Sequence, residues 1–184
     1  MSSRFAREEK GSASIEAVIM VPAMFLCILT FVTLIDYTRL HGMHQKAAYT
    51  ISDMVSRETL PIDADYLAGT KALLDTLTRN PQTSTVRLSI VRYDAERDIF
   101  KLDWSKTEGY ATPVSNQDVS GWTDRLPASM VHNERMIVVE TSALYKPPFD
   151  VGLGNKQIEN FIFTRPRYAP QVLWQDLEPD FAGS

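Results

Sequence analysis

The chain has 184 residues, of which 44% are hydrophobic and 23% are charged, a composition typical of a folded chain of about one domain. Its net charge of −4 and its pI near 5.4 leave no basic excess to neutralise a phosphate backbone, which argues against nucleic acid as a partner. Its one cysteine, Cys27, excludes an intramolecular disulfide and cysteine-rich zinc or CxxC redox frameworks. An exported domain of this chain must therefore be held together by its core.

Apolar residues are concentrated near the start of the chain. The nineteen residues 17–35 carry no charge, and Thr30 and Thr33 are their only polar side chains. As a helix they would be about 28 Å long at about 1.5 Å per residue, close to the roughly 30 Å of hydrocarbon in a bilayer. The segment predicts a transmembrane helix, which we assign to residues 12–36.

The segment has three other interpretations. A secretory signal peptide has an apolar region of about 7–15 residues and then a small-x-small cleavage site, whereas Thr33-Leu34-Ile35-Asp36 offers no such site. A lipoprotein signal needs small residues before its cysteine, but Cys27 follows Met24-Phe25-Leu26 and is interpreted as lipid-facing or packing filler. A core helix buried in a soluble domain stays open as the alternative.

The flanking charges predict the orientation of the segment. Three cations precede it, namely Arg4, Arg7 and Lys10, and the next ones are Arg39 and Lys46. By the positive-inside rule, the short basic leader favours a cytoplasmic N-terminus and export of everything after Asp36. No later apolar run brings the chain back, so a single pass and an extracytoplasmic domain over residues 37–184 are expected.

Glu16 is a carboxylate at the mouth of the apolar segment, where charge is disfavoured unless it is compensated. In one interpretation it lies among lipid headgroups and is stabilised by the N-terminal dipole of the helix. In the other, the chain is cut after Gly11, and the new ammonium of Ser12 lies one helical turn from Glu16 on the same face. Opposite charges could then pair within or between subunits.

The run Lys10-Gly11-Ser12-Ala13-Ser14-Ile15-Glu16, followed by an apolar helix, resembles a type IV prepilin leader. The resemblance implies that residues 1–11 are a leader and that a prepilin peptidase cuts after Gly11. It also implies that Ser12 is the new N-terminus and that Glu16 aligns each incoming subunit with its neighbour.

More narrowly, residues 11–25 (GSASIEAVIMVPAMF) and 48–57 (AYTISDMVSR) resemble the TadE/TadF-like proteins of the tight-adherence (Tad/Flp) pilus system, and residues 165–168 (RPRY) do so more weakly. Ser12 departs from the methylated Phe of many type IV pilins, and Ala17 departs from the Tyr typical of the small Flp major pilins. The resemblance therefore implies a minor, pilin-like subunit. Whether it is TadE-like or TadF-like, and whether it enters the filament, stays open.

The helical pattern continues beyond the apolar segment. Apolar residues recur at spacings of three and four up to Val55, which predicts one helix over residues 12–58 that ends at Leu60-Pro61. A second helix is expected from Asp63 or Asp65 to Arg79, with an aspartate cap. Its predicted buried face comprises Tyr66, Leu67, Leu73, Leu74 and Leu77.

The remaining pattern predicts strands. Residues 85–93 alternate with Val86, Leu88 and Ile90 on one side, and residues 99–104 alternate with Phe100, Leu102 and Trp104 on one side. The polar residues 94–98 between them indicate an antiparallel hairpin. Further strands are expected over residues 135–145 and 160–164, and residues 105–134 are interpreted as a long loop. The expected fold is α+β, a pilin-like arrangement of a helical spine with a small antiparallel sheet.

Signals of catalysis are weak. His41 and His44 are three residues apart on the predicted helix, but a zinc site needs a third ligand and none is indicated nearby, so they are interpreted as exposed juxtamembrane histidines. His132-Asn133-Glu134 resembles half of a hydrolase motif without its cysteine partners, and a loop or strand edge explains it better. No nucleotide, phosphate or hydrolase motif occurs. We expect no enzyme, no cofactor and no metal.

The sequence thus predicts a minor pilin-like protein, or pseudopilin, that assembles or initiates an adhesive Tad/Flp pilus of the kind associated with biofilms. The expected partners are a prepilin peptidase, the major Flp-type pilin, other minor pilins, the inner-membrane assembly platform and membrane lipid. The expected location is the bacterial inner membrane, with a periplasmic C-terminal domain. The alternative is an unprocessed single-pass protein with a periplasmic sensor or scaffold domain. The tail after Pro170, with Val172, Trp174, Leu177 and Phe181, is left open between packing back and engaging a partner.

Overall fold

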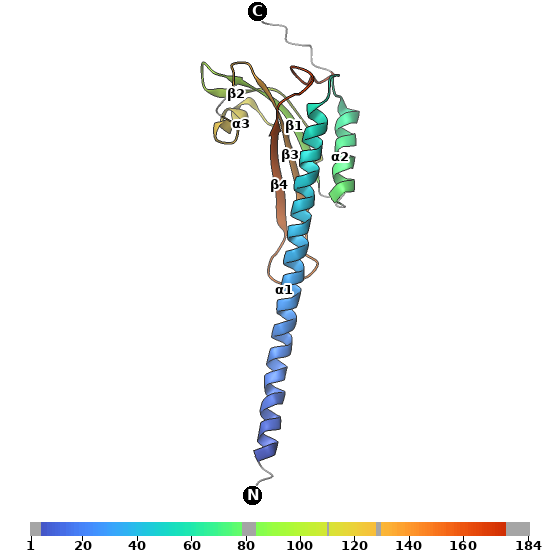
Figure 1. Cartoon of the computed structure of the whole chain (residues 1–184), viewed down its shortest axis with the longest axis vertical. Coiled ribbons are helices and arrows are strands. Elements are labelled where there is room, and N and C mark those ends of the chain that lie inside the picture. Colours follow the sequence, from blue (N-terminus) through green and yellow to red (C-terminus); the bar gives the residue numbers. More distant parts are fainter. Residues whose placement is uncertain (1–4, 79–83, 110, 128–129, 176–184) are drawn as a thin grey trace, which may run out of the picture. The chain divides into compact units, whose positions relative to one another are not determined.

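The computed structural model describes residues 5–78, 84–109, 111–127 and 130–175, with side-chain surroundings from residue 15 onward. The chain is α+β, and Figure 1 shows a long N-terminal helix, a second helix and a small sheet. The elements in order are α1 (Phe5–Ser56), α2 (Ala64–Thr78), β1 (Thr85–Asp94), β2 (Ile99–Glu108), α3 (Asn116–Ser120), a 3-10 turn η1 (Trp122–Asp124), β3 (Arg135–Tyr145) and β4 (Lys156–Thr164).

Two compact units make up the chain. One comprises Met1–Arg39 and Tyr145–Lys156, and the other comprises Leu40–Leu144 and Gln157–Ser184. α1 contributes to both units, because it runs without interruption from Phe5 to Ser56. The change from the apolar run to a mixed sequence after residue 36 thus falls inside one helix. The segment between β3 and β4 belongs to the same unit as the apolar half of that helix.

The predicted long helix is present, but it begins at Phe5, before the expected start at residue 12. Residues 6–10 (AREEK) are strong helix formers, and together they outweigh the roughly 1 kcal/mol that Gly11 costs in a helix. The helix ends at Ser56, close to the predicted end. There the backbone N–H of Arg167 donates to the Ser56 carbonyl at 2.8 Å and satisfies one of the last free acceptors.

The second helix is confirmed, with Asp63 as its cap: the Asp63 Oδ1 accepts a hydrogen bond from the Tyr66 N–H at 2.8 Å. The prediction that Leu77 is buried is wrong, since its side chain is 41% exposed. The buried face instead follows Leu67, Thr70, Leu74 and Thr78. Leu77 lies about 100° round the helix from Thr78 and therefore misses that face.

The sheet has four strands in the order β2-β1-β3-β4. The predicted antiparallel hairpin is confirmed, with Asp94 opposite Ile99 at its turn, and β1 also pairs antiparallel with β3. β3 has the expected bounds, Arg135–Tyr145, whereas β4 begins at Lys156 and is longer than predicted. β2 also extends beyond the expected end, as far as Glu108.

A β-bulge in β2 overturns one predicted face of the hairpin. Ile90 pairs with Trp104, but the next residue, Val91, pairs with Leu102, so Asp103 is an extra residue in β2. Trp104 consequently lies on the opposite face from Leu102. The Asp103 carboxylate accepts from the Arg135 Nε at 2.8 Å and lies 3.5 Å from the Arg92 Nε, so the bulge is stabilised by two guanidinium groups.

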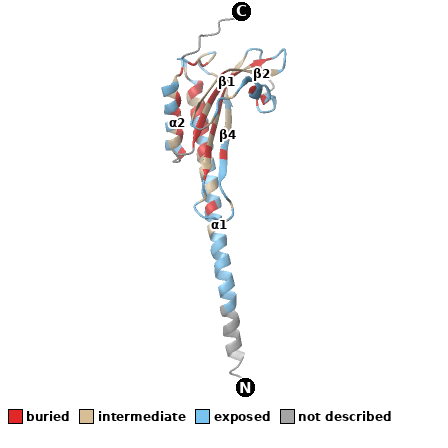
Figure 2. Ribbon diagram, turned by 180° about the vertical axis from the view of Figure 1, so that it is seen from behind, coloured by how far each residue is buried: buried red, intermediate tan, exposed pale blue. Residues whose placement is uncertain are grey.

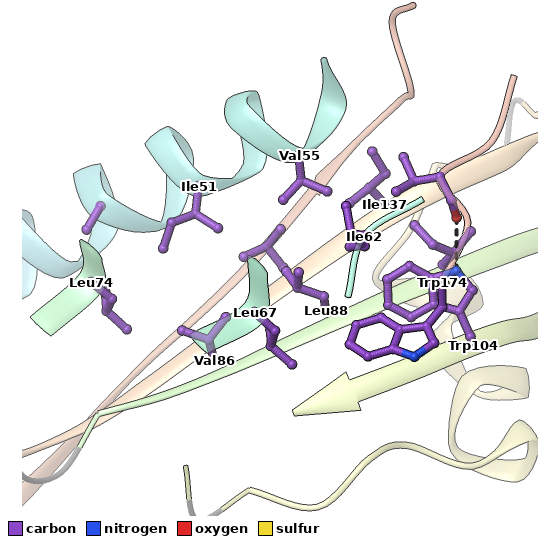
Figure 3. Close-up of a cluster of buried hydrophobic side chains, with 14 residues drawn as sticks. Ile51, Val55, Ile62, Leu67, Leu74, Val86, Leu88, Trp104, Ile137 and Trp174 are labelled. Carbon is purple, nitrogen blue, oxygen red and sulfur yellow. Dashed lines mark hydrogen bonds between the residues drawn. The ribbon is translucent and has the colours of Figure 1, made fainter. Parts of the chain in front are cut away.

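Each face of the sheet carries its own core. The face toward α1 and α2, shown in Figure 3, buries a cluster that includes Ile51, Val55, Leu67, Leu74, Val86, Leu88, Ile90, Trp104, Ile137 and Trp174. The opposite face buries Val91, Tyr93, Phe100, Val119, Trp122, Leu126, Met130, Met136 and Val138. The predicted common side of Val86, Leu88 and Ile90 is confirmed.

The expectation of a long loop over residues 105–134 is wrong. After β2, α3 and η1 cover the second face of the sheet and bury Val119 and Trp122. α3 begins with a capping box, in which Ser115 and Asp118 bond to each other's backbone N–H groups. A helix of five residues is too short to show the periodicity on which the prediction depended.

The segment before the C-terminus packs back onto the core, which answers part of the question left open by the sequence. Ile62 forms a parallel bridge with Trp174, and the Trp104 Nε1 donates to the Val172 carbonyl at 2.9 Å, the dashed line in Figure 3. The rings of Trp104 and Trp174 lie 5.6 Å apart. Leu177 and Phe181 lie outside the described residues.

Replacing Trp174 by alanine should destabilise the fold by about 3–5 kcal/mol, because it leaves a cavity against Trp104 and exposes the core beside Ile62. Tyr168→Ala is the matched control, since that aromatic side chain is 68% exposed and its loss should change the free energy of unfolding by less than about 0.5 kcal/mol. Denaturant unfolding of the full chain in detergent measures both. Equal stability of the two variants would contradict this account of the tail.

Candidate functional site: the apolar half of α1

The apolar half of α1 is uncovered on nearly all sides. Between residues 15 and 35, only Thr33 is buried and only Leu29 is half-buried, and Figure 2 shows this stretch as exposed helix. The exposed large side chains are Ile15, Val18, Ile19, Met20, Val21, Met24, Phe25, Leu26, Ile28, Phe31, Val32, Leu34 and Ile35. Soluble monomers rarely leave so much contiguous apolar surface open to water. A helix in the core of a soluble domain would be mostly covered, but only 6% of the most apolar window of α1 is buried.

The two threonine hydroxyls inside this stretch are satisfied within the helix. The Thr30 hydroxyl donates to the Leu26 carbonyl at 2.8 Å, and the Thr33 hydroxyl donates to the Leu29 carbonyl at 2.8 Å. Pro22 lies inside the helix and has no N–H to donate to the Val18 carbonyl, so one hydrogen bond of the helix is missing. Helices that span membranes tolerate a proline at such a position. In length and composition, the helix can cross a membrane.

The three residues singled out for processing and register all belong to α1. Gly11 and Ser12 are described only as helical backbone, and their surroundings lie outside the described side chains. Glu16 is exposed, and none of the described side chains forms an ion pair with it. Ser12 and Glu16 are four residues apart on this helix and thus share a face.

A tyrosine distant in sequence is bound at the end of the apolar stretch. The Tyr145 hydroxyl lies 3.2 Å from the Thr33 carbonyl oxygen and 3.2 Å from the Asp36 Oδ2, and the Tyr37 ring meets the Tyr145 ring edge-on at 5.3 Å. Burial, helped by the nearby Asp36 carboxylate, raises the pKa of Tyr145 above its ordinary value. Sequence reasoning missed this contact because 109 residues separate Tyr145 from Asp36.

The expectation that both histidines are exposed holds for His41 but is wrong for His44, which is fully buried. Neither ring nitrogen of His44 has a hydrogen-bond partner among the described residues. Burial lowers the pKa of His44, the charge of His41 adds to that effect, and Asp75 opposes it. In the part of the chain that the structure describes, no group of three His, Cys, Asp or Glu side chains could hold a metal.

His132-Asn133-Glu134 forms the turn before β3. The Ala95 N–H donates to the His132 Nδ1 at 3.2 Å, and the Glu134 carboxylate accepts from the Val131 N–H at 2.9 Å and the Arg165 Nε at 2.8 Å. Asn133 has a positive φ of 64°, which suits a turn. These contacts give the motif a structural role at the end of a strand.

A depression of about 750 Å³ opens over β1, β3 and β4. Three of the four charged side chains described around it have partners: the Arg87 Nε bonds to Glu140 at 2.6 Å, and the Arg125 guanidinium lies 3.8 Å from the centre of the Phe161 ring, whereas Glu159 is exposed. The described lining includes the hydroxyls of Thr85 and Ser142 but no histidine that could activate them. Among the described residues, the depression therefore combines hydroxyl, amide and charged groups without a hydroxyl–histidine pair.

Comparisons of the chain with protein-family models, with curated proteins and with solved structures found no match. The geometry defines an α+β protein with a four-stranded antiparallel sheet and a long N-terminal helix that is apolar enough to span a membrane.

Acid should destabilise the protein through His44. An unfolded histidine takes up a proton near pH 6.5, whereas burial holds the folded pKa lower, so the contribution of His44 to stability is lost as the pH falls below about 6.5. His44→Leu should remove part of the fall in Tm between pH 7.5 and 5.5, and the exposed His41→Leu should retain most of it. Thermal unfolding of the full chain in detergent measures both, and identical pH profiles for His44→Leu and the parent would contradict the prediction.

Proposed function

We propose that this chain is a minor pilin-like subunit, or pseudopilin, of an adhesive Tad/Flp-type pilus, processed by a prepilin peptidase after Gly11. The observation that carries the proposal is the uncovered apolar stretch of residues 15–35. It begins within the leader-like run of residues 10–16, and α1 continues from it without a break to residues that pack on the sheet.

The apolar half of α1 acts twice in this proposal. In the inner membrane, lipid covers its exposed side chains and the α+β part lies in the periplasm. Leaving the bilayer for water would cost about 1.5–3 kcal/mol for each large apolar side chain, so the helix leaves only if another apolar surface replaces the lipid. Helices of the major Flp-type pilin and of other minor pilins, brought together at the assembly platform, provide that surface.

Glu16 sets the register of this packing. A carboxylate surrounded by apolar neighbours carries a desolvation cost that an opposite charge offsets. The ammonium of Ser12, created by cleavage, is such a charge, and in a bundle it can come from an adjacent subunit. Because Glu16 is unpaired among the described side chains, it is available for that contact.

Two of the segments that resemble the TadE/TadF-like proteins meet in space, which supports the proposal. Asp53, in the run of residues 48–57, bonds to Arg167, in the run of residues 165–168, at 3.1 Å, and to Arg57 at 2.8 Å. These side chains are about half exposed, so the ion pairs contribute little stability. The segment after β4 also contacts the end of α1 through its backbone, because the Arg167 N–H donates to the Ser56 carbonyl at 2.8 Å.

We propose no enzymatic activity and no cofactor. In this role the only reaction is cleavage of the chain after Gly11, which the peptidase catalyses. The protein itself contributes the apolar surface of α1 and the carboxylate of Glu16, which sets the register of packing.

Cleavage is the decisive test. When the full chain is coexpressed with a prepilin peptidase, N-terminal sequencing of the membrane-extracted protein should give a terminus at Ser12, and Gly11→Ala should abolish it. A peptidase with its catalytic residues replaced is the control. If Met1 or Ser2 stays at the terminus under all conditions, the protein is instead the unprocessed single-pass sensor or scaffold.

Replacing Glu16 should separate assembly from processing. Glu16→Ala should leave membrane insertion and cleavage intact but reduce incorporation into pilus complexes at least about tenfold, since a lost pairing of about 1.4 kcal/mol already has that effect. Glu8→Ala, in the segment that cleavage removes, is the control and should assemble normally. Crosslinking to other pilins, quantified against total membrane protein, provides the measurement. Normal incorporation of Glu16→Ala would refute the role in register.

A further inference from the structure

The segment that joins β3 to β4 is tied to the end of the apolar stretch. Tyr145, at its start, binds the Thr33 carbonyl oxygen and the Asp36 carboxylate, and residues 145–156 form one compact unit with the first 39 residues. Figure 1 shows this connection beside α1. We call residues 146–155 the β3–β4 loop.

The β3–β4 loop has the composition of a membrane-interface segment. Its middle carries Phe149, whose side chain is 41% exposed, and the half-buried Val151 and Leu153. Exposed lysines flank it on both sides, Lys146 at its start and Lys156 directly after it. An apolar centre between cations suits a boundary where acyl chains meet anionic headgroups.

The backbone of the loop turns sharply next to these side chains. The Val151 N–H donates to the Phe149 carbonyl at 3.0 Å, and Gly152 and Gly154 have positive φ values of 85° and 58°. The one acidic residue, Asp150, accepts from the Gly152 N–H at 3.4 Å, so its charge is partly engaged within the turn. Residues 146–156, which include Lys156 directly after the loop, hold two lysines and one aspartate and thus carry a net charge of +1.

We propose that the β3–β4 loop is a second membrane contact, with Phe149 inserted at the headgroup–acyl boundary of the periplasmic leaflet and Lys146 and Lys156 on anionic headgroups. This inference rests on the proposed anchoring of the protein by α1. The loop thereby defines a lipid-binding surface in addition to the helix that spans the bilayer.

The depth of the contact follows from which helix residues are covered. Thr33 is buried and Leu29 is half-buried, although both belong to the apolar run that ends at Ile35. At about 1.5 Å per residue, Thr33 lies roughly 3 Å inside the end of that run. Tyr145 touches Thr33 from outside the helix, so the start of the loop lies at the edge of the hydrocarbon.

The covered residues also decide which side of the helix the loop occupies. Leu29, Thr33 and Tyr37 follow one another at intervals of four and form one stripe, while the rest of the apolar surface is exposed. A lipid contact made on one stripe restricts rotation of α1 about its own axis. The remaining surface stays free for lipid or for other helices.

Depth-dependent quenching tests the proposal on the full chain. In a Cys27→Ser background, Phe149→Cys is labelled with an environment-sensitive fluorophore and reconstituted into phosphatidylcholine–phosphatidylglycerol vesicles that contain spin-labelled lipid. Insertion to about 5–10 Å, the depth of an interfacial apolar side chain, should give strong quenching and a blue-shifted emission. Pro148 is also exposed, so the Pro148→Cys variant repeats the measurement if Phe149→Cys folds poorly.

Two controls separate the proposal from its premise. The parent protein labelled at Cys27, which is exposed on the apolar helix, reports whether α1 is in the bilayer. Glu96→Cys, in the polar turn between β1 and β2, reports non-specific adsorption. Quenching at Cys27 without quenching at residue 149 would overturn the loop contact and leave the anchor standing. Absence of quenching at Cys27 would overturn the membrane anchor and, with it, the loop contact. Equal quenching at residues 149 and 96 would indicate non-specific adsorption and would also overturn the loop contact.

Discussion

The uncovered apolar surface of α1 between residues 15 and 35 is the constraint on which the rest of this structure depends. Soluble monomers rarely leave so many large apolar side chains open to water, and in length and composition this half of the helix can cross a membrane. The other half has a different partner, since Ile51 and Val55 are buried against α2 and the sheet. One uninterrupted helix must therefore satisfy two environments, and the change between them falls near Asp36, the first charged residue after the apolar run.

The sheet in turn must bury two faces at once, and the β-bulge at Asp103 makes this possible. By adding one residue to β2, the bulge directs Phe100 and Leu102 to one face and Trp104 to the other, so a single strand contributes to both cores. Arg92 and Arg135 surround the Asp103 carboxylate and offset the cost of the irregular pairing. The Trp104 ring can then pack against the tilted Trp174 ring, and this contact holds the segment before the C-terminus on the face of the sheet that carries the helices.

Two polar side chains, Tyr145 and His44, lie close to the part of α1 where the apolar run ends. Tyr145 donates its hydroxyl near the end of the apolar run, with acceptors on Thr33 and Asp36, and thereby fixes the connection between β3 and β4. His44 lies farther along the same helix, fully buried and without a hydrogen-bond partner among the described residues, so burial lowers its pKa and favours the neutral imidazole. Asp36, which Tyr145 contacts, and His44, which is buried, thus both lie in α1 after the end of the apolar run at Ile35.

Local patterns in the sequence were sufficient to predict the apolar helix, the aspartate cap of α2, the hairpin and the bounds of β3, because each depends on residues near one another in the chain. They were also sufficient to single out Gly11, Ser12 and Glu16, although the roles of these residues stay proposals. The face of Trp104, the burial of His44 and the binding of Tyr145 to Asp36 were decided only by the tertiary structure. A bulge reverses an alternation that the sequence does not reveal, and burial or a contact across 109 residues depends on which surfaces meet when the chain folds.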